Sequence, residues 1–166
     1  YNHPELRRAL EAKGYRFYSH GDTEVLLKAY HAWGEDFVTR LNGMFAFAIW
    51  ERDSGRVLFG RDRLGIKPLY YAATDRGVAF GSEIKALFAS GLIAPRMDHA
   101  RVAEYLVFRQ VAGPNSLFAG VQSVPPGHVV QVELGQPSEP RAFWTAAEPP
   151  HVFNGSFLEA VDALDA

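Results

Sequence analysis

The stretch Met44-Phe45-Ala46-Phe47-Ala48-Ile49-Trp50 marks the point at which the chain changes from helical patterns to strand patterns. An unbroken apolar run of this length is typical of a strand that is buried on both faces. Shorter apolar runs follow at 57–60, 69–72 and 78–81, each after a turn that contains Gly. This part of the chain therefore predicts an antiparallel meander of about four strands.

Helical patterns lie on both sides of these strands. Asn2 or His3 can cap a first helix that has Pro4 in its first turn, and Gly14 is placed to end it. Further helices are predicted from residue 22 or 23 to 33, over 35–41 and 82–90, and from Asp98 to 109, with strands over 15–18, 117–124 and 128–134. An apolar sheet needs cover on both sides, so the prediction is a layered α+β domain with a mainly antiparallel sheet or pair of sheets.

The composition changes after Gly135. The segments 136–140 and 148–150 are rich in proline and polar residues, as linkers are. Residues 156–166 then form an amphipathic helical pattern, with Phe157, Val161 and Leu164 on one side. We expect a linker followed by one helix.

Composition excludes several classes of function. The 166 residues carry 17 Lys and Arg against 19 Asp and Glu, a formal net charge of −2, so no broad cationic surface is expected for nucleic acid or an acidic membrane. The absence of cysteine removes disulfides, thiolate zinc sites and a cysteine nucleophile from the chain itself, and the six histidines lack the spacing of paired metal ligands. With no bilayer-length apolar run and no secretory signal pattern, a cytoplasmic location is the expectation.

Two segments could carry chemistry. In the first, His20-Gly21-Asp22-Thr23-Glu24, a carboxylate follows a glycine at the start of a helix. Asp22 could bind a substrate ammonium while the bare backbone of Gly21 admits a ligand closely. The alternative is that Asp22 only caps the helix, and the residues alone favour the cap.

The second segment runs from Gly60 to Tyr71 and places Arg61, Asp62 and Arg63 between two predicted strands. A solvated turn with a surface ion pair between Arg61 and Asp62 would add at most about 1 kcal/mol. Because charge is dense here for a turn between buried strands, we predict instead that these side chains fix the loop structurally.

The same residues carry a resemblance to a known family. In order along the chain, the segments 21–25, 41–50, 61–71, 82–87 and 125–128 resemble the glutamine-hydrolysing domain of asparagine synthetase, a class II glutamine amidotransferase. The resemblance covers about residues 1–145. The form Arg-Asp-Arg-Leu-Gly-Ile-Lys-Pro-Leu-Tyr-Tyr at 61–71 is more similar to asparagine synthetases than to purine-pathway or hexosamine relatives.

The resemblance implies an N-terminal nucleophile hydrolase fold, a four-layer αββα sandwich of antiparallel sheets. It also implies that an N-terminal cysteine attacks the carboxamide of glutamine, with its own α-amino group as base. The ammonia released would travel inside the protein to a second site, where ATP has activated aspartate as an adenylate. No cofactor is expected in this domain, and ATP and Mg²⁺ are expected in the synthetase domain that follows it in the same polypeptide.

Few site residues transfer from the family. Asp22 matches the aspartate that pairs with the α-ammonium of glutamine, and Gly21 is a weaker companion in substrate binding. Met44 is predicted on a strand near the ammonia exit, although a methionine in the protein core is the simpler interpretation. The boundaries expected are 1–147 for the glutaminase domain, without its N-terminal strands, and 148–166 for a linker and first helix leading into the synthetase domain.

The departures from the family pattern are large. The nucleophilic cysteine, the arginine for the glutamine carboxylate and the Asn-Gly of the Asn-Gly-Glu-Ile-Tyr-Asn motif should precede Tyr1, and the Ser-Gly-Gly-x-Asp-Ser pyrophosphate loop should follow Ala166. We therefore expect a middle segment, truncated at both ends, that releases no ammonia by itself. Loss of strands before Tyr1 would expose sheet edges and favour self-association, for instance as a homodimer.

Two other functions stay open from the sequence. One is an inactive amidotransferase-like scaffold, as in β-lactam synthetase relatives or other amide-forming ligases. The other is a regulatory or assembly domain that binds no glutamine. The sequence does not fix the acceptor that is amidated, because the missing synthetase domain decides it.

Overall fold

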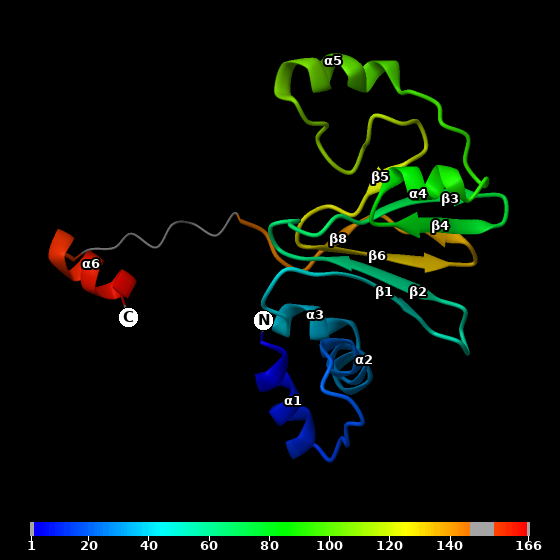
Figure 1. The fold of residues 1–166 in the computed structure, drawn as a ribbon. Coiled ribbons are helices and arrows are strands. Elements are labelled where there is room, and N and C mark those ends of the chain that lie inside the picture. Colours follow the sequence, from blue (N-terminus) through cyan, green and yellow to red (C-terminus); the bar gives the residue numbers. More distant parts are fainter. Residues whose placement is uncertain (1, 147–154, 166) are drawn as a thin grey trace.

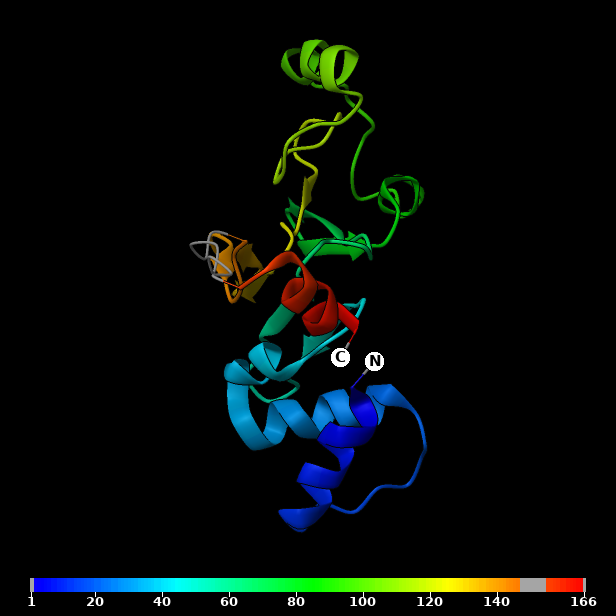
Figure 2. The same cartoon turned by 90° about the vertical axis from the view of Figure 1, so that its left-hand side faces the viewer.

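A computed structural model describes residues 2–146 and 155–165 and shows two antiparallel sheets stacked between two layers of helices (Figure 1). One layer contains α1 (His3–Ala12), α2 (Asp22–Trp33), the 3-10 turn η1 (Gly34–Asp36) and α3 (Phe37–Arg40). The other contains α4 (Ile84–Ala89) and α5 (His99–Phe108). Figure 2 shows the same layers from the side, with α1–α3 in blue and α5 in green at opposite ends. The αββα order expected from the resemblance is confirmed.

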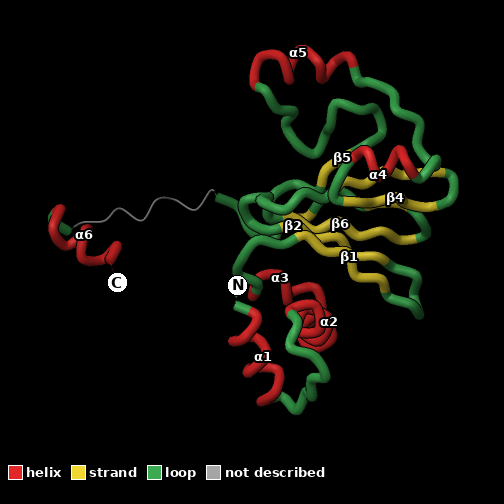
Figure 3. The backbone as a smooth tube through the Cα atoms, in the orientation of Figure 1, coloured by secondary structure: helices red, strands yellow, loops and turns green. Residues whose placement is uncertain are grey.

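The strands form two sheets rather than one meander. The first sheet has the order β1-β2-β6-β7, with β8 also paired to β6, and the second has the order β4-β3-β5. Figure 3 shows the strands in yellow between the helices in red. The bounds are β1 Ala46–Trp50, β2 Val57–Arg61, β3 Tyr70–Thr74, β4 Gly77–Gly81, β5 Gln122–Ser123, β6 His128–Glu133, β7 Gln136–Pro137 and β8 Arg141–Ala142.

The predicted meander is wrong because the loop after β2 carries the chain from one sheet to the other. β2 pairs with β1 and β6, whereas β3 pairs with β4 and β5. Each hairpin was predicted correctly, but apolar patterning does not say whether consecutive hairpins share a sheet. Stacking them face to face buries the residues between the sheets, among them Phe59, Tyr71 and Val130.

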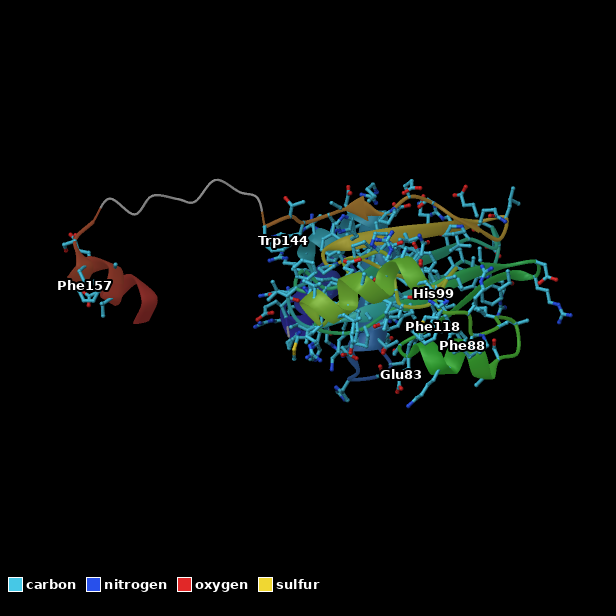
Figure 4. The ribbon with its side chains drawn as sticks, turned by 90° about the horizontal axis from the view of Figure 1, so that it is seen from above. Glu83, Phe88, His99, Phe118, Trp144 and Phe157 are labelled. Atoms are coloured by element: carbon cyan, nitrogen blue, oxygen red, sulfur yellow. The ribbon has the colours of Figure 1, made fainter. Side chains whose placement is uncertain are left out.

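Three apolar cores separate the four layers. Leu6, Leu10, Val25 and other side chains of α1–α3 pack on the outer face of β1, β2 and β6. The second core lies between the sheets. The third is smaller and joins β3 to α4 through Ala72 and Leu87, with Phe88 and Phe118 at its margin. Figure 4 shows Phe88 beside Phe118. The two rings pack edge to face, with 4.9 Å between their centroids.

Burial of β1 on both faces was predicted wrongly. Phe47 and Ile49 are buried against the helices, but Ala48 and Trp50 are exposed. β1 lies at the edge of its sheet, and the second sheet, with its three strands, leaves this part of the opposite face uncovered. An apolar run therefore does not establish that both faces of a strand are covered.

Three further expectations need correction. Residues 15–18 form no strand, since Tyr15 and Phe17 pack as loop residues against the first core. The strand predicted over 117–124 shrinks to β5, because a bend at 117 and a turn at 119–120 interrupt that segment. The segment 136–140 is not a linker at its start, because β7 pairs with β6 and extends the sheet. The second linker segment, 148–150, lies outside the described residues.

The helices form where they were predicted, but the predicted side-chain caps of α1 and α2 are absent. The segment predicted as one helix over 35–41 divides into the end of η1 and α3. α1, α2, α4 and α5 begin within two residues of their predicted starts, and the Asp98 carboxylate caps α5 by accepting the Ala100 N–H at 3.0 Å. α6 (Phe157–Asp165) forms where the last amphipathic pattern predicts it. Among the helices in the described ranges, none has the length and apolar character needed to cross a membrane.

Candidate functional site

A cavity of about 670 Å³ lies where the N-terminal ends of α1 and α2 face β1 and the loop after β2. This volume falls in the range of small-molecule sites. Its walls are mostly apolar, with a few polar groups. They include Asn2, His3, Leu6, Asp22, Thr23, Val25, Asn42, Gly43, Met44, Phe45, Lys67, Pro68 and Ser82.

Asp22 lines this cavity and does not cap its helix. The N-cap of α2 is Gly21, in extended backbone conformation, and no side chain caps the helix. The Asp22 carboxylate is exposed and accepts a long hydrogen bond of 3.5 Å from the Thr23 hydroxyl. It forms no ion pair with any residue in the described ranges. The capping interpretation favoured by the residues is therefore wrong, and the carboxylate is available to a ligand.

Gly21 gives the backbone beside Asp22 an open surface. A Cβ built on Gly21 would meet only the Ser19 hydroxyl oxygen, at 3.8 Å. Gly21 does not line the cavity itself. It lies next to a residue that does, so the two predicted site residues are adjacent but only Asp22 faces the cavity.

Glu24 fixes the loop that leads into Asp22, a role that the sequence did not reveal. Its carboxylate accepts hydrogen bonds from the Tyr18 N–H (3.0 Å), the Ser19 N–H (2.7 Å) and the Ser19 hydroxyl (2.7 Å), and it pairs with Lys28. The Lys28 ammonium, followed by Ser19 and Tyr18, lowers the pKa of Glu24 to about 2. The Ser19–Glu24 spacing of five differs from the spacing of three in a capping box, which is why the pattern gave no signal.

The turn Asn42-Gly43 forms another part of the wall and is held by Asn2. The Asn2 side chain donates to the Arg40 carbonyl at 2.8 Å and accepts the Asn42 N–H at 2.9 Å, and the Asn2 N–H donates to the Asn42 carbonyl at 3.3 Å. Gly43 has a φ of 142°, which side chains strongly disfavour. These contacts tie the start of α1 to the start of β1 across one end of the cavity.

The charged loop after β2 is fixed structurally, as predicted. The Asp62 side chain is 1% exposed and accepts backbone N–H groups of the loop. Arg61 donates to the carbonyls of Gly65, Lys67 and Val124 at 2.7–2.9 Å. Arg61 and Asp62 form no ion pair with each other, since each is bound to backbone groups instead.

Met44 lines the cavity with 45% of its surface exposed, in the turn two residues before β1 begins. It therefore lies neither on a strand nor in a core, so the predicted strand position and the alternative of a core methionine are both wrong. Among the described residues, no three His, Asp or Glu side chains gather as metal ligands would. His3 is the histidine that lines the cavity.

Comparison with known proteins decides the family. The sequence profile described as "Glutamine amidotransferase domain" matches residues 1–144. The chain belongs to this family. The amidotransferase domain has the αββα architecture and carries Asp22 beside the cavity.

Several relatives of the amidotransferase domain are asparagine synthetases. The domain is 40% identical over 131 residues to asparagine synthetase [glutamine-hydrolyzing] 3 of Bacillus subtilis, covering 78% of this chain and 21% of the relative. It is 44% identical over 128 residues to asparagine synthetase [glutamine-hydrolyzing] 1 of the same organism, covering 76% and 20%. The putative asparagine synthetase of Mycobacterium tuberculosis is 36% identical over 140 residues, covering 82% and 22%. The chain thus spans about a fifth of the length of these relatives.

A solved structure has the same fold. The glutamine phosphoribosylpyrophosphate amidotransferase of B. subtilis, complexed with ADP and GMP, superposes with a TM-score of 0.62 at 20% sequence identity. The superposition covers 87% of this chain and 27% of that protein. At this identity the likeness establishes the N-terminal nucleophile type of fold and nothing about substrate.

Proposed function

We propose that this chain is the glutaminase domain of a glutamine-dependent and ATP-dependent asparagine synthetase. Family membership and the names of the relatives support this function. The observation that carries it is Asp22, a carboxylate on the wall of a cavity of about 670 Å³ that has no ion-pair partner in the part of the chain that the structure describes. The proposed reaction converts glutamine and water to glutamate and ammonia.

Asp22 binds the α-ammonium of glutamine in this proposal. A charge-assisted hydrogen bond to a carboxylate is about twice as strong as a neutral one, and it gains strength when the ligand excludes water. The methylene groups contact the apolar part of the cavity wall. Gly21 leaves the backbone beside the ammonium open. Glu24 and Lys28 hold the loop that leads into Gly21 and Asp22.

The nucleophile in this reaction is a cysteine thiol supplied from outside the sequence given. The sulfur attacks the carboxamide carbon, the proton passes through the α-amino group to the leaving nitrogen, and ammonia departs. Water then hydrolyses the thioester to release glutamate and regenerate the thiol. Residues 1–147 hold the substrate, and 148–166 lead into a synthetase domain of the same polypeptide. In that domain, aspartate would be activated with ATP and Mg²⁺ as a β-aspartyl adenylate. We also propose that the protein is located in the cytoplasm.

Met44 lies on the proposed route of ammonia out of the cavity. A Met44→Trp substitution in the intact protein is expected to leave glutamine hydrolysis near its original rate and to reduce formation of the amide product. The measurement compares glutamate and asparagine released per ATP consumed. Equal, unimpaired yields of both products would place the exit elsewhere.

The test of the proposed function uses the longer protein that contains this chain. Saturating L-glutamine at about 100 times the dissociation constant stabilises a folded protein by about 2.7 kcal/mol, which raises the melting temperature by several degrees. We expect Asp22→Ala to abolish this shift and Asp53→Ala, in the exposed turn after β1, to keep it. A shift that survives Asp22→Ala would contradict the proposal. Binding without any release of ammonia would support the scaffold alternative.

A further inference from the structure

The Asp62 carboxylate occupies an unusual position, because it is buried and its hydrogen-bond partners among the described residues are all backbone N–H groups. The residue is 1% exposed. One oxygen, Oδ1, accepts the N–H groups of Leu64 (3.2 Å) and Ile66 (2.9 Å). The other, Oδ2, accepts those of Phe45 (3.3 Å) and Lys67 (3.0 Å). Several backbone donors can satisfy a buried carboxylate without a cation.

The two carboxylate oxygens of Asp62 bond to different segments of the chain. Oδ1 bonds only within the loop after β2, whereas Oδ2 joins that loop to Phe45, just before β1. Phe45 and Lys67 both line the cavity, on separate segments of the chain. A single oxygen atom therefore links two walls of the cavity.

The backbone of Asp62 extends the same junction. Its N–H donates to the Phe45 carbonyl at 2.9 Å, and its carbonyl accepts the N–H groups of Gly65 (3.0 Å) and Gly127 (2.9 Å). Gly65 has a φ of 64°, and a Cβ there would come within 2.8 Å of the Pro126 ring. Arg61 holds the Gly65 and Lys67 carbonyls from the other side. The loop thus has little freedom as long as the carboxylate is intact.

We propose that Asp62 is a positioning residue of the glutamine site, which sets the distance between the Phe45 wall and the Lys67–Pro68 wall of the cavity. The inference rests on the proposed function, since it assigns the cavity to glutamine. Asp62 does not touch the substrate. It acts through the walls, and a small shift of either wall changes the fit of a ligand that both walls contact.

Asp62→Asn separates the two tasks of the carboxylate. The carboxamide has one acceptor oxygen, and its NH₂ group faces two N–H donors that it cannot satisfy. With its oxygen in the place of Oδ1, the amide keeps the bonds to Leu64 and Ile66 and loses those to Phe45 and Lys67. We expect the KM for glutamine to rise at least tenfold in the full-length protein, at a temperature where circular dichroism shows the variant to be folded.

Two controls distinguish positioning from stability. Val132→Ala removes part of the core between the sheets, at the end of β6 that pairs with Val57 rather than near the loop, and lowers the melting temperature without a change in KM. Asp53→Asn removes a charge from an exposed turn and leaves both quantities unchanged. An Asp62→Asn protein that loses stability like Val132→Ala but keeps the original KM would overturn the inference. A wild-type protein that binds no glutamine would instead contradict the proposed function.

A second measurement needs no variant and can overturn the inference even if Asp62→Asn does not fold. In wild-type protein titrated with L-glutamine, the backbone amide resonances of Phe45 and Lys67 should shift together, with the same apparent dissociation constant. The Val132 amide serves as the reference and should not shift. Glutamine binding that moves neither the Phe45 nor the Lys67 amide would overturn the inference.

Discussion

The two helical layers of the sandwich differ in how firmly they are attached to their sheets. The first layer inserts a row of side chains into the largest core, whereas α4 buries only Leu87 and α5 buries none of its residues. The C-terminal turn of α5 instead leaves Leu106, Val107 and Phe108 about two-thirds exposed (68–71%). The buried residues of the first layer are Leu6, Leu10, Val25, Ala29, Phe37 and Val38.

This difference concerns function because the candidate site lies on the firmly packed side. α1 and α2 bring Asn2 and Asp22 to the cavity, and both helices are anchored by fully buried residues such as Leu10 and Ala29. A binding site needs walls that hold their geometry, and rigid helices supply this better than loops do. Among the described residues, the layer of α4 and α5 contributes to the cavity wall only Ser82, just before α4.

The largest effect is expected from truncating the first core. Phe37 is fully buried and contacts Tyr30 and Phe47, so Phe37→Ala should lower the free energy of unfolding by about 3–5 kcal/mol. Phe108→Ala on α5 should change it by less than about 0.5 kcal/mol, because that ring is already exposed. Urea unfolding of both variants measures the difference. Comparable losses would mean that the two layers are equally attached.

A smaller effect is expected from the ion pairs of each layer. Arg56 joins Glu51 at 2.7 Å and Glu35 at 3.3 Å beneath α2 and η1, and with Tyr30 it lowers the pKa of Glu51 to about 2. Arg56→Gln should cost about 1–2 kcal/mol, because the partly buried Glu51 loses its cation and Glu35 keeps only its ion pair with Arg141.

The matched pair in the other layer is Lys85 with Glu83, whose side chains are 82% and 61% exposed. Lys85→Gln should cost less than about 0.5 kcal/mol. Addition of 1 M salt should reduce the small Lys85 effect further and leave most of the Arg56 effect. Equal costs for the two substitutions would remove this distinction between the layers.

The smallest expected effect is the loss of stability at low pH that results from protonation of Glu24. The pKa of Glu24 lies at about 2 in the folded protein, below the ordinary value of 4.5, so the carboxylate stabilises the folded state at pH values above its ordinary pKa. This contribution is lost as the pH falls from about 4.5 to about 2. The stability difference between wild type and Glu24→Gln, measured by urea unfolding, should be constant at pH 6–7 and shrink below pH 4.5. A difference that does not depend on pH would show that the Glu24 charge does not hold the loop.

The sequence predicted local elements well and their assembly less well. Apolar spacing placed α1, α2 and α5, and the predicted Asp98 cap forms at α5, because these signals are local. The division of four strands between two sheets was missed, since it depends on long-range pairing of β2 with β6 and of β3 with β5. The pairing of β7 with β6 was hidden by a proline-rich composition that suits a linker as well as an edge strand.

The candidate site shows the same limit. Asp22 was identified through a family resemblance, while its residue type and position at a helix start favoured a cap. The backbone-only environment of Asp62 was partly foreseen, because charges between buried strands must be satisfied. The roles of Asn2 and Glu24 depend on contacts that no spacing rule describes: Asn2 bonds to residues about 40 positions away.

The central claim, that Asp22 recognises the amine of a free amino acid, is tested most directly by calorimetry with two ligands. One is L-glutamine and the other is its analogue without the α-amino group, titrated into the full-length wild-type and Asp22→Asn proteins. The account predicts that the substitution weakens glutamine binding at least tenfold and leaves binding of the amine-free analogue unchanged. Equal affinity of wild type and Asp22→Asn for glutamine would contradict it.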